Sequence, residues 1–187
     1  MRVIGGNLKG RRLFSPHWKG LRPTSDRLRE TLFDVLGDRI AGLRVLDGCA
    51  GTGALGIEAL SRGAAHAVFI ERDARAVALI KRNLEHCALQ PRSTVRRATL
   101  PHALRRPVPR PFDLVLLDPP YGASDIGAIL TAAGTVLGAD GLLVIERARG
   151  CALPEVDGLN SQREVRAGNG VIEFFSAVVV MCKPATE

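Results

Sequence analysis

A glycine-rich loop occupies residues 47–56, with the sequence Asp-Gly-Cys-Ala-Gly-Thr-Gly-Ala-Leu-Gly. It follows an apolar run, and three of its glycines have the G-x-G-x-x-G spacing that lets a backbone approach a nucleotide cofactor closely: Gly51, Gly53 and Gly56. Glu71 lies 20 residues after Gly51, where an acid can accept hydrogen bonds from two ribose hydroxyls. Asp47 would repel a pyrophosphate but attract an ammonium and a sulfonium, so the loop favours S-adenosylmethionine.

A second cluster, Asp118-Pro119-Pro120-Tyr121, directly follows the apolar run 112–117. Ligands sit beyond the carboxyl ends of the strands in an open parallel sheet, so this cluster should face the same crevice as the glycine loop. Asp118 and the carbonyl of Pro119 can accept the hydrogens of an exocyclic base amine and align its lone pair with a methyl donor. The prolines stiffen that carbonyl, and Tyr121 offers a ring on which a flipped base can stack.

Alternating strand and helix patterns must position these two clusters. We expect strands at 43–46, 67–70, 94–96, 112–117 and 142–145, and helices at 54–62, 74–87 and 126–137, after a first helix that starts behind Pro23-Thr24-Ser25. Two last strands, near 161–166 and 171–181, have no helix between them and indicate an antiparallel hairpin. The pattern predicts an α/β fold with a mostly parallel, Rossmann-like sheet.

The positive charge of the chain is concentrated in two segments. The net charge is +7; residues 1–30 hold eight basic and two acidic residues, and residues 92–110 hold six arginines and no acid. Two basic segments on a body that is otherwise slightly acidic indicate binding to a polyanion, and we expect nucleic acid at the first segment. Trp18 and Phe14 lie within it and can pack either on bases or on the core.

Length and composition exclude several classes of protein. A chain of 187 residues with 46% hydrophobic and 24% charged residues forms one domain with a small appendage and is not disordered. We expect no signal peptide, because the first residues lack an apolar h-region. We also expect no transmembrane helix, because no apolar run is long enough to cross a membrane. The four cysteines form no Cys-x-x-Cys pair, so we expect no metal site and no disulfide, as in a reducing cytoplasm.

These motifs together resemble the bacterial 16S ribosomal RNA guanine-N2 methyltransferases of the RsmD type, over nearly the whole chain. The resemblance rests on the opening segment 2–13, on the signature 20–33, on the stretch 47–64, on Glu71 and on the Asp-Pro-Pro-Tyr cluster. It implies a class I S-adenosylmethionine-dependent methyltransferase fold with a small N-terminal β-hairpin extension. It also implies methyl transfer to the N2 amine of a guanine in 16S ribosomal RNA of an assembling small subunit.

The residues and the resemblance together predict three sets of site residues. The catalytic set is Asp118, Pro119, Pro120 and Tyr121. The S-adenosylmethionine-binding set is Asp47, Gly51, Thr52, Gly53, Glu71, Arg72, Ala98 and Thr99. The RNA-binding set is Arg2, Lys9, Arg11, Arg12, Arg22, Thr24 and Arg27. We expect residues 1–23 to form a basic, RNA-contacting extension, residues 24–187 to form the methyltransferase domain, and the protein to be a cytoplasmic monomer.

The sequence departs from this family in two places. Gly48-Cys49 stands where the family more often has a bulky apolar pair, so we expect a looser loop wall. Thr99 stands where many members carry an aspartate that binds the adenine amine, and we expect a backbone group at Ala98 or Thr99 to replace it.

Four other functions can be compared with guanine-N2 methylation of ribosomal RNA. A DNA adenine-N6 methyltransferase also uses Asp-Pro-Pro-Tyr but typically needs an added target-recognition region. An NAD-dependent oxidoreductase would leave that cluster and the basic N-terminus unexplained. A non-catalytic ribosome-binding protein would not need the intact cluster. Cytosine C5 methylation would need a nucleophilic cysteine beside the base, whereas Cys49 lies in the cofactor loop.

Overall fold

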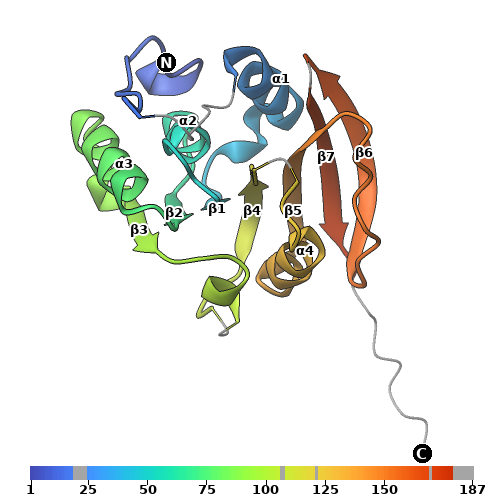
Figure 1. Ribbon diagram of the computed structural model, residues 1–187. Coiled ribbons are helices and arrows are strands. Elements are labelled where there is room, and N and C mark those ends of the chain that lie inside the picture. The colour runs from blue at the N-terminus through green and yellow to red at the C-terminus, as the bar shows by residue number, and fades with distance from the viewer. Residues whose placement is uncertain (19–24, 106–107, 121, 169, 179–187) are drawn as a thin grey trace, which may run out of the picture.

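Seven strands form a single sheet in the computed structural model, which describes residues 1–18, 25–105, 108–120, 122–168 and 170–178 (Figure 1). The strand order is β3-β2-β1-β4-β5-β7-β6. The bounds are β1 Arg44–Gly48, β2 His66–Glu71, β3 Ser93–Arg97, β4 Phe112–Leu117, β5 Leu137–Ala148, β6 Leu159–Ala167 and β7 Gly170–Ala177. The first five strands are parallel, and the order reverses between β1 and β4, where ligands bind in open α/β sheets.

Helices cover both faces of this sheet because its strands alternate apolar side chains between two buried clusters. Three helices pack on one face, namely α1 (Asp26–Leu36), α2 (Ala54–Ser61) and α3 (Ala74–His86), and α4 (Ile126–Thr135) packs on the other. Short 3₁₀ turns connect the elements: η1 Gly6–Leu8, η2 Gly37–Ile40, η3 Gln90–Arg92 and η4 His102–Leu104. None of the helices in the described ranges is both long and apolar enough to cross a membrane.

The antiparallel hairpin expected from the last two strands of the chain is confirmed. β7 pairs antiparallel with β5 and with β6, so it lies between them. The fourth helix ends at Thr135 rather than at 137, and β5 begins at Leu137 rather than at 142. Val136 and Leu137 are drawn into the sheet because the Phe112 amide donates to the Val136 carbonyl (2.9 Å) and Leu137 pairs with Phe112.

The N-terminal segment folds back on itself as a very short hairpin. Arg2 and Arg12 form one antiparallel bridge, and the Val3 amide donates to the Arg11 carbonyl (2.9 Å) around the turn at η1. Val3 and Leu13 are buried in the same core cluster as α1 and α2. The segment therefore packs as a part of the main core.

Candidate functional site

The glycine loop makes a sharp turn from β1 into α2. Gly51 and Gly53 have φ values of +55° and +77°, a left-handed conformation that glycine adopts without strain. A Cβ atom on Gly56 would overlap the ring of Phe69, so this glycine lets α2 pack closely on β2. The Gly56 amide donates to Oδ2 of Asp47 (2.8 Å), which ties the end of β1 to the first turn of the helix.

Glu71, at the end of β2, holds the glycine loop from the other side. Its Oε2 accepts a hydrogen bond from the Gly51 amide (2.9 Å), and its Oε1 accepts one from the Asp73 amide (2.8 Å). A carboxylate has about four lone-pair sites, so both oxygens keep the capacity to accept from a ligand. Glu71 also lines the cavity described below, so it can meet ribose hydroxyls while it orders the loop.

Three carboxylates, Asp47, Glu71 and Asp118, lie at the carboxyl ends of β1, β2 and β4. Burial raises the pKa of Asp47 well above its ordinary value, against the lowering effect of the Gly56 amide, and the carboxylates of Asp118 and Glu71 raise it further. Oδ1 of Asp47 is buried and accepts no hydrogen bond within the described part of the chain. A cationic ligand would relieve both conditions, so these residues fit the ammonium and sulfonium of S-adenosylmethionine better than a phosphate.

One cavity of about 670 Å³ joins the two sequence clusters. Its lining includes most of the predicted cofactor and catalytic residues: Asp47, Gly51, Thr52, Glu71, Arg72, Ala98, Thr99, Asp118, Pro119 and Pro120. Gly53 does not line it, because it caps α2 and lies against Ile80. Tyr121 lies outside the described residues, so its predicted stacking role stays a prediction.

The two departures from the family pattern have different structural outcomes. The expected looser wall at Gly48 is wrong, because a Cβ there would come within 2.7 Å of the Leu117 side chain and 3.0 Å of the Leu100 side chain. Those two leucines fill the space. The Ala98 amide donates to the Glu71 carbonyl (3.0 Å) as part of the sheet. An adenine amine needs an acceptor in place of the aspartate, and the Ala98 carbonyl and the oxygens of Thr99 are acceptors. Both residues line the cavity, so the expected replacement at Ala98 or Thr99 stays a prediction.

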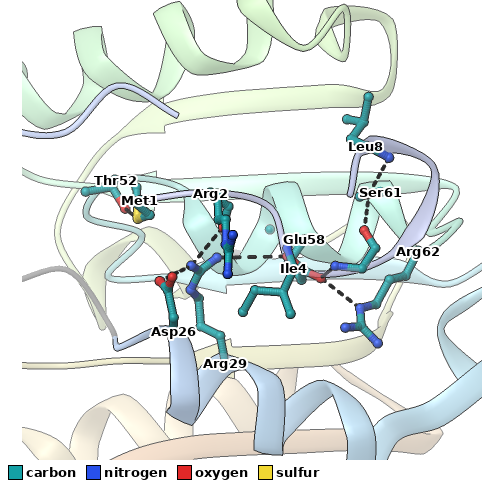
Figure 2. A network of polar contacts seen from close by, with 12 residues as sticks. Met1, Arg2, Ile4, Leu8, Asp26, Arg29, Thr52, Glu58, Ser61 and Arg62 are labelled. Atoms are coloured by element: carbon teal, nitrogen blue, oxygen red, sulfur yellow. Dashed lines mark hydrogen bonds and ion pairs between the residues drawn. The ribbon is translucent and has the colours of Figure 1, made fainter. Parts of the chain in front are cut away.

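Buried polar residues that sequence reasoning missed hold the N-terminal segment against α2 (Figure 2). Glu58 is fully buried; it accepts from the amides of Ile4 (2.8 Å) and Gly5 (2.7 Å) and from Nε of Arg62 (2.9 Å). Ser61 accepts from the Leu8 amide (3.0 Å). The sequence indicates such a buried acid, because Glu58 stands alone within the otherwise apolar run Gly-Ile-Glu-Ala-Leu.

Asn83, on α3, is a second missed residue and connects the N-terminal segment to the glycine loop. Its side chain accepts from the Phe14 amide (2.8 Å) and donates to the carbonyls of Phe14 and Thr52 (3.2 Å each). Asn83 is fully buried between Ile80 and Leu84 on the inner face of the helix. A polar residue at an apolar position of the helical repeat was the signal here.

The basic residues among positions 1–30 differ in their surroundings. The side chains of Arg2, Lys9, Arg11, Arg12 and Arg27 are exposed, as binding to RNA requires. Arg29 does not belong to this surface, because it is fully buried and donates to the Arg2 carbonyl (2.9 Å) and to Asp26 (2.7 Å). Arg22 and Thr24 lie outside the described residues.

Phe14 and Trp18, the two aromatic residues of this segment, lie in different places. Phe14 packs on α3, with the Arg82 guanidinium 3.6 Å from its ring centre. Trp18 lines the cavity, with the Arg75 guanidinium 5.1 Å from its ring. Only Trp18 is therefore placed where it could contact a base that enters the cavity.

Several known proteins are similar in sequence to this chain. The chain is 40% identical to YlbH of Bacillus subtilis over 162 residues, which are 84% of this chain and 88% of that protein. It is 40% identical to Ribosomal RNA small subunit methyltransferase D of Escherichia coli strain K12 over 121 residues, 65% of this chain and 60% of the relative. The aligned part therefore spans less than two thirds of that enzyme's length.

Solved structures extend the likeness over nearly the whole fold. The protein yhhF of Escherichia coli superposes with a TM-score of 0.84 at 31% identity, over 95% of this chain and 97% of that one. A precorrin-6y C5,15-methyltransferase of Geobacter metallireducens, at 17% identity, shares the fold with a TM-score of 0.64 over 91% of this chain and 96% of its own. These neighbours establish the class I methyltransferase fold.

A protein family matches nearly the whole chain. The family described as Conserved hypothetical protein 95 matches residues 1–176, which include the N-terminal segment, the glycine loop and the Asp-Pro-Pro-Tyr cluster. The chain therefore belongs to that family.

Proposed function

We propose that this protein is an S-adenosylmethionine-dependent methyltransferase that methylates the exocyclic N2 amine of a guanine in 16S ribosomal RNA of the assembling small subunit. One observation carries the proposal: Asp118, Pro119 and Pro120 line the same cavity as the glycine loop and Glu71. A site for a nucleoside cofactor and a site for a base amine thus share one space. The methyltransferases of this family to which the chain is about 40% identical act, by name, on ribosomal RNA.

The cofactor part of the cavity is built for a cationic nucleoside ligand. S-adenosylmethionine, when bound, supplies an electrophilic methyl group on a positively charged sulfur. Asp47 provides the negative charge for it, and Glu71 provides the acceptors for the ribose. Gly51 and Thr52 provide the close-fitting backbone, and Gly53 supports them by capping α2 behind the cavity. Arg72, Ala98 and Thr99 complete the predicted set on the adenosine side.

The catalytic part of the cavity orients the amine. The lone pair of an exocyclic amine is delocalised into the ring, so the free amine is a weak nucleophile. Asp118 and the Pro119 carbonyl accept its two hydrogens, which holds the nitrogen in place and favours a more tetrahedral geometry. Pro119 is buried and Pro120 follows it, so the carbonyl direction is fixed before the substrate arrives. Groups aimed in advance at the reacting atom typically contribute about 10²–10³ in rate.

The N-terminal segment and the first turn of α1 supply the contact with the RNA backbone. Exposed Arg2, Lys9, Arg11, Arg12 and Arg27 meet phosphates, joined by Arg22 and Thr24 of the predicted set. In this proposal residues 1–23 form the RNA-contacting extension of a methyltransferase domain at 24–187, and the protein works as a cytoplasmic monomer.

Substitution of Asp118 tests the proposed chemistry. Asp118→Ala should lower the single-turnover rate of methyl transfer to small subunits by about 10²–10³. Asp118→Asn, which keeps an acceptor oxygen, should lower the rate less. S-adenosylmethionine affinity, measured by calorimetry, should change much less than the rate in both variants. Near-wild-type turnover in both would remove Asp118 from the reaction, and methylation of another base or position would overturn the guanine assignment.

A further inference from the structure

A second carboxylate stands beside Asp118 at the same edge of the sheet. Leu117 of β4 pairs in register with Ile145 of β5, so Asp118 and Glu146 each follow directly behind this pair on neighbouring parallel strands. Adjacent strands lie about 4.8 Å apart, and side chains alternate between faces. Leu117 and Ile145 face the cluster of α4, so Asp118 and Glu146 point toward the opposite face.

The surroundings of Glu146 make it part of the cavity wall. It lines the cavity together with Asp118, Leu28 and Gly170, and its Oε2 atom is buried. A Cβ on Gly170 would lie 3.2 Å from Oε1 of Glu146 and 2.9 Å from the Leu28 side chain, so the glycine leaves room for the carboxylate. Glu146 holds neither the cofactor nor the reacting amine in the proposed mechanism.

The strand order places Glu146 on the substrate side of the cavity. Glu71 ends β2, Asp118 follows β4, and Glu146 lies in β5, and the sheet runs β2-β1-β4-β5. Asp118 therefore stands between the cofactor residues and Glu146. If Asp118 holds the reacting amine, the rest of that base edge extends away from the cofactor, toward β5.

We propose that Glu146 is a specificity residue that accepts the N1–H of the target guanine, beside the N2 amine held by Asp118. This inference rests on the proposed function. Guanine has two adjacent donors on this edge, N1–H and the N2 amine, and two adjacent carboxylates match them. Adenine and cytosine place an acceptor nitrogen beside their amine, which a carboxylate repels. Glu146 thereby selects guanine among the bases that carry an exocyclic amine.

A base analogue separates this role from a structural one. 2-Aminopurine keeps the amine of guanine but has an acceptor at N1 in place of the N1–H. Small subunits are reconstituted with guanine or 2-aminopurine at the target position, once mapped, and methylated under single-turnover conditions. Wild-type protein should prefer guanine by about tenfold to a hundredfold, the effect of one charge-assisted hydrogen bond. Glu146→Gln can donate to the N1 acceptor, so it should reduce or reverse that preference.

Binding gives a second readout that does not depend on turnover. With S-adenosylhomocysteine present, the dissociation constants of the two kinds of subunit should change in the same direction as the rates. Glu173→Gln is the matched control, because Glu173 is a similarly buried carboxylate of the same sheet that pairs with Arg147 outside the cavity. It should keep the wild-type preference.

Two results would overturn the role of Glu146. One is a wild-type protein that methylates and binds both analogues equally. The other is a Glu146→Gln variant that keeps the full preference for guanine. Failure of the proposed function would look different, because the wild-type protein would then form no N2-methylguanine on guanine-containing subunits.

Discussion

Glu58 offers the sharpest test of how the basic segment is held. Its two carboxylate oxygens accept three hydrogen bonds, from Ile4, Gly5 and Arg62, and Nη1 of Arg29 lies 3.9 Å from Oε2. In Glu58→Gln the shape is kept, but one oxygen becomes an NH₂ group that cannot accept. Whichever way the amide turns, at least one donor of this buried site faces another donor.

The expected loss of stability follows from this geometry. Breaking a buried ion pair by removing one charge costs about 3–5 kcal/mol, and an orphaned buried donor alone costs about 1–3 kcal/mol. For a chain of this size 1 kcal/mol corresponds to about 2–4 °C, so the melting temperature should fall by about 6–20 °C. If the N-terminal segment detaches before the rest unfolds, limited proteolysis should cut it first.

Urea and thermal unfolding of the purified variants measure this loss. Glu30→Gln is the control, because Glu30 is an exposed acid on α1, and its stability should stay within about 0.5 kcal/mol of wild type. A Glu58→Gln variant that unfolds like the control, and whose N-terminal segment resists protease as in wild type, would refute the anchoring role.

Three further outcomes are expected. Glu71→Ala should weaken S-adenosylmethionine binding by about tenfold to a hundredfold in calorimetry, because a charged acceptor for the ribose and a support of the loop are both lost; unchanged affinity would contradict this. Changing Arg11 and Arg12 together to Ala should flatten the salt slope of RNA binding by roughly 1.5 units with cofactor affinity intact, because both side chains are exposed; an unchanged slope would make them a merely solvated surface. Burial, with Glu71 and other carboxylates nearby, raises the pKa of Cys49 to about 12. Because only the thiolate reacts, iodoacetamide at pH 8 should label exposed Cys151 well before Cys49, as followed by peptide mass spectrometry. Labelling of Cys49 should rise with pH, and equal labelling rates of the two cysteines would refute this.

The parts of the site that follow strand ends could be predicted from the sequence. Asp47, Glu71 and Asp118 each lie at or directly after the carboxyl end of an apolar strand, and parallel strands bring these ends to one edge. The β6–β7 hairpin was equally predictable, because no helical pattern separates the two strands. Local pattern and topology together were sufficient for these features.

Residues whose role depends on distant partners could not be predicted in this way. Glu58 and Asn83 bind backbone groups 31 to 69 positions away in the chain, and no local pattern encodes such a partner. Glu146 was missed because its relation to Asp118 depends on the register of β4 and β5. Arg29 is buried although it is one of the eight basic residues counted in 1–30, because a count of charges does not distinguish a buried guanidinium from an exposed one.

The anchoring contacts bear on how RNA binding and cofactor binding are related. Asn83 binds both Phe14 of the N-terminal segment and the Thr52 carbonyl of the glycine loop, and the Thr52 hydroxyl lies 3.6 Å from the Met1 sulfur. Glu58 and Ser61, on the helix that the loop opens, hold the same segment. The exposed arginines therefore project from a scaffold whose position is set by the cofactor loop and by α2. The proposed phosphate contacts and the proposed methyl-donor site are thus connected through the buried side chains of Asn83, Glu58 and Ser61.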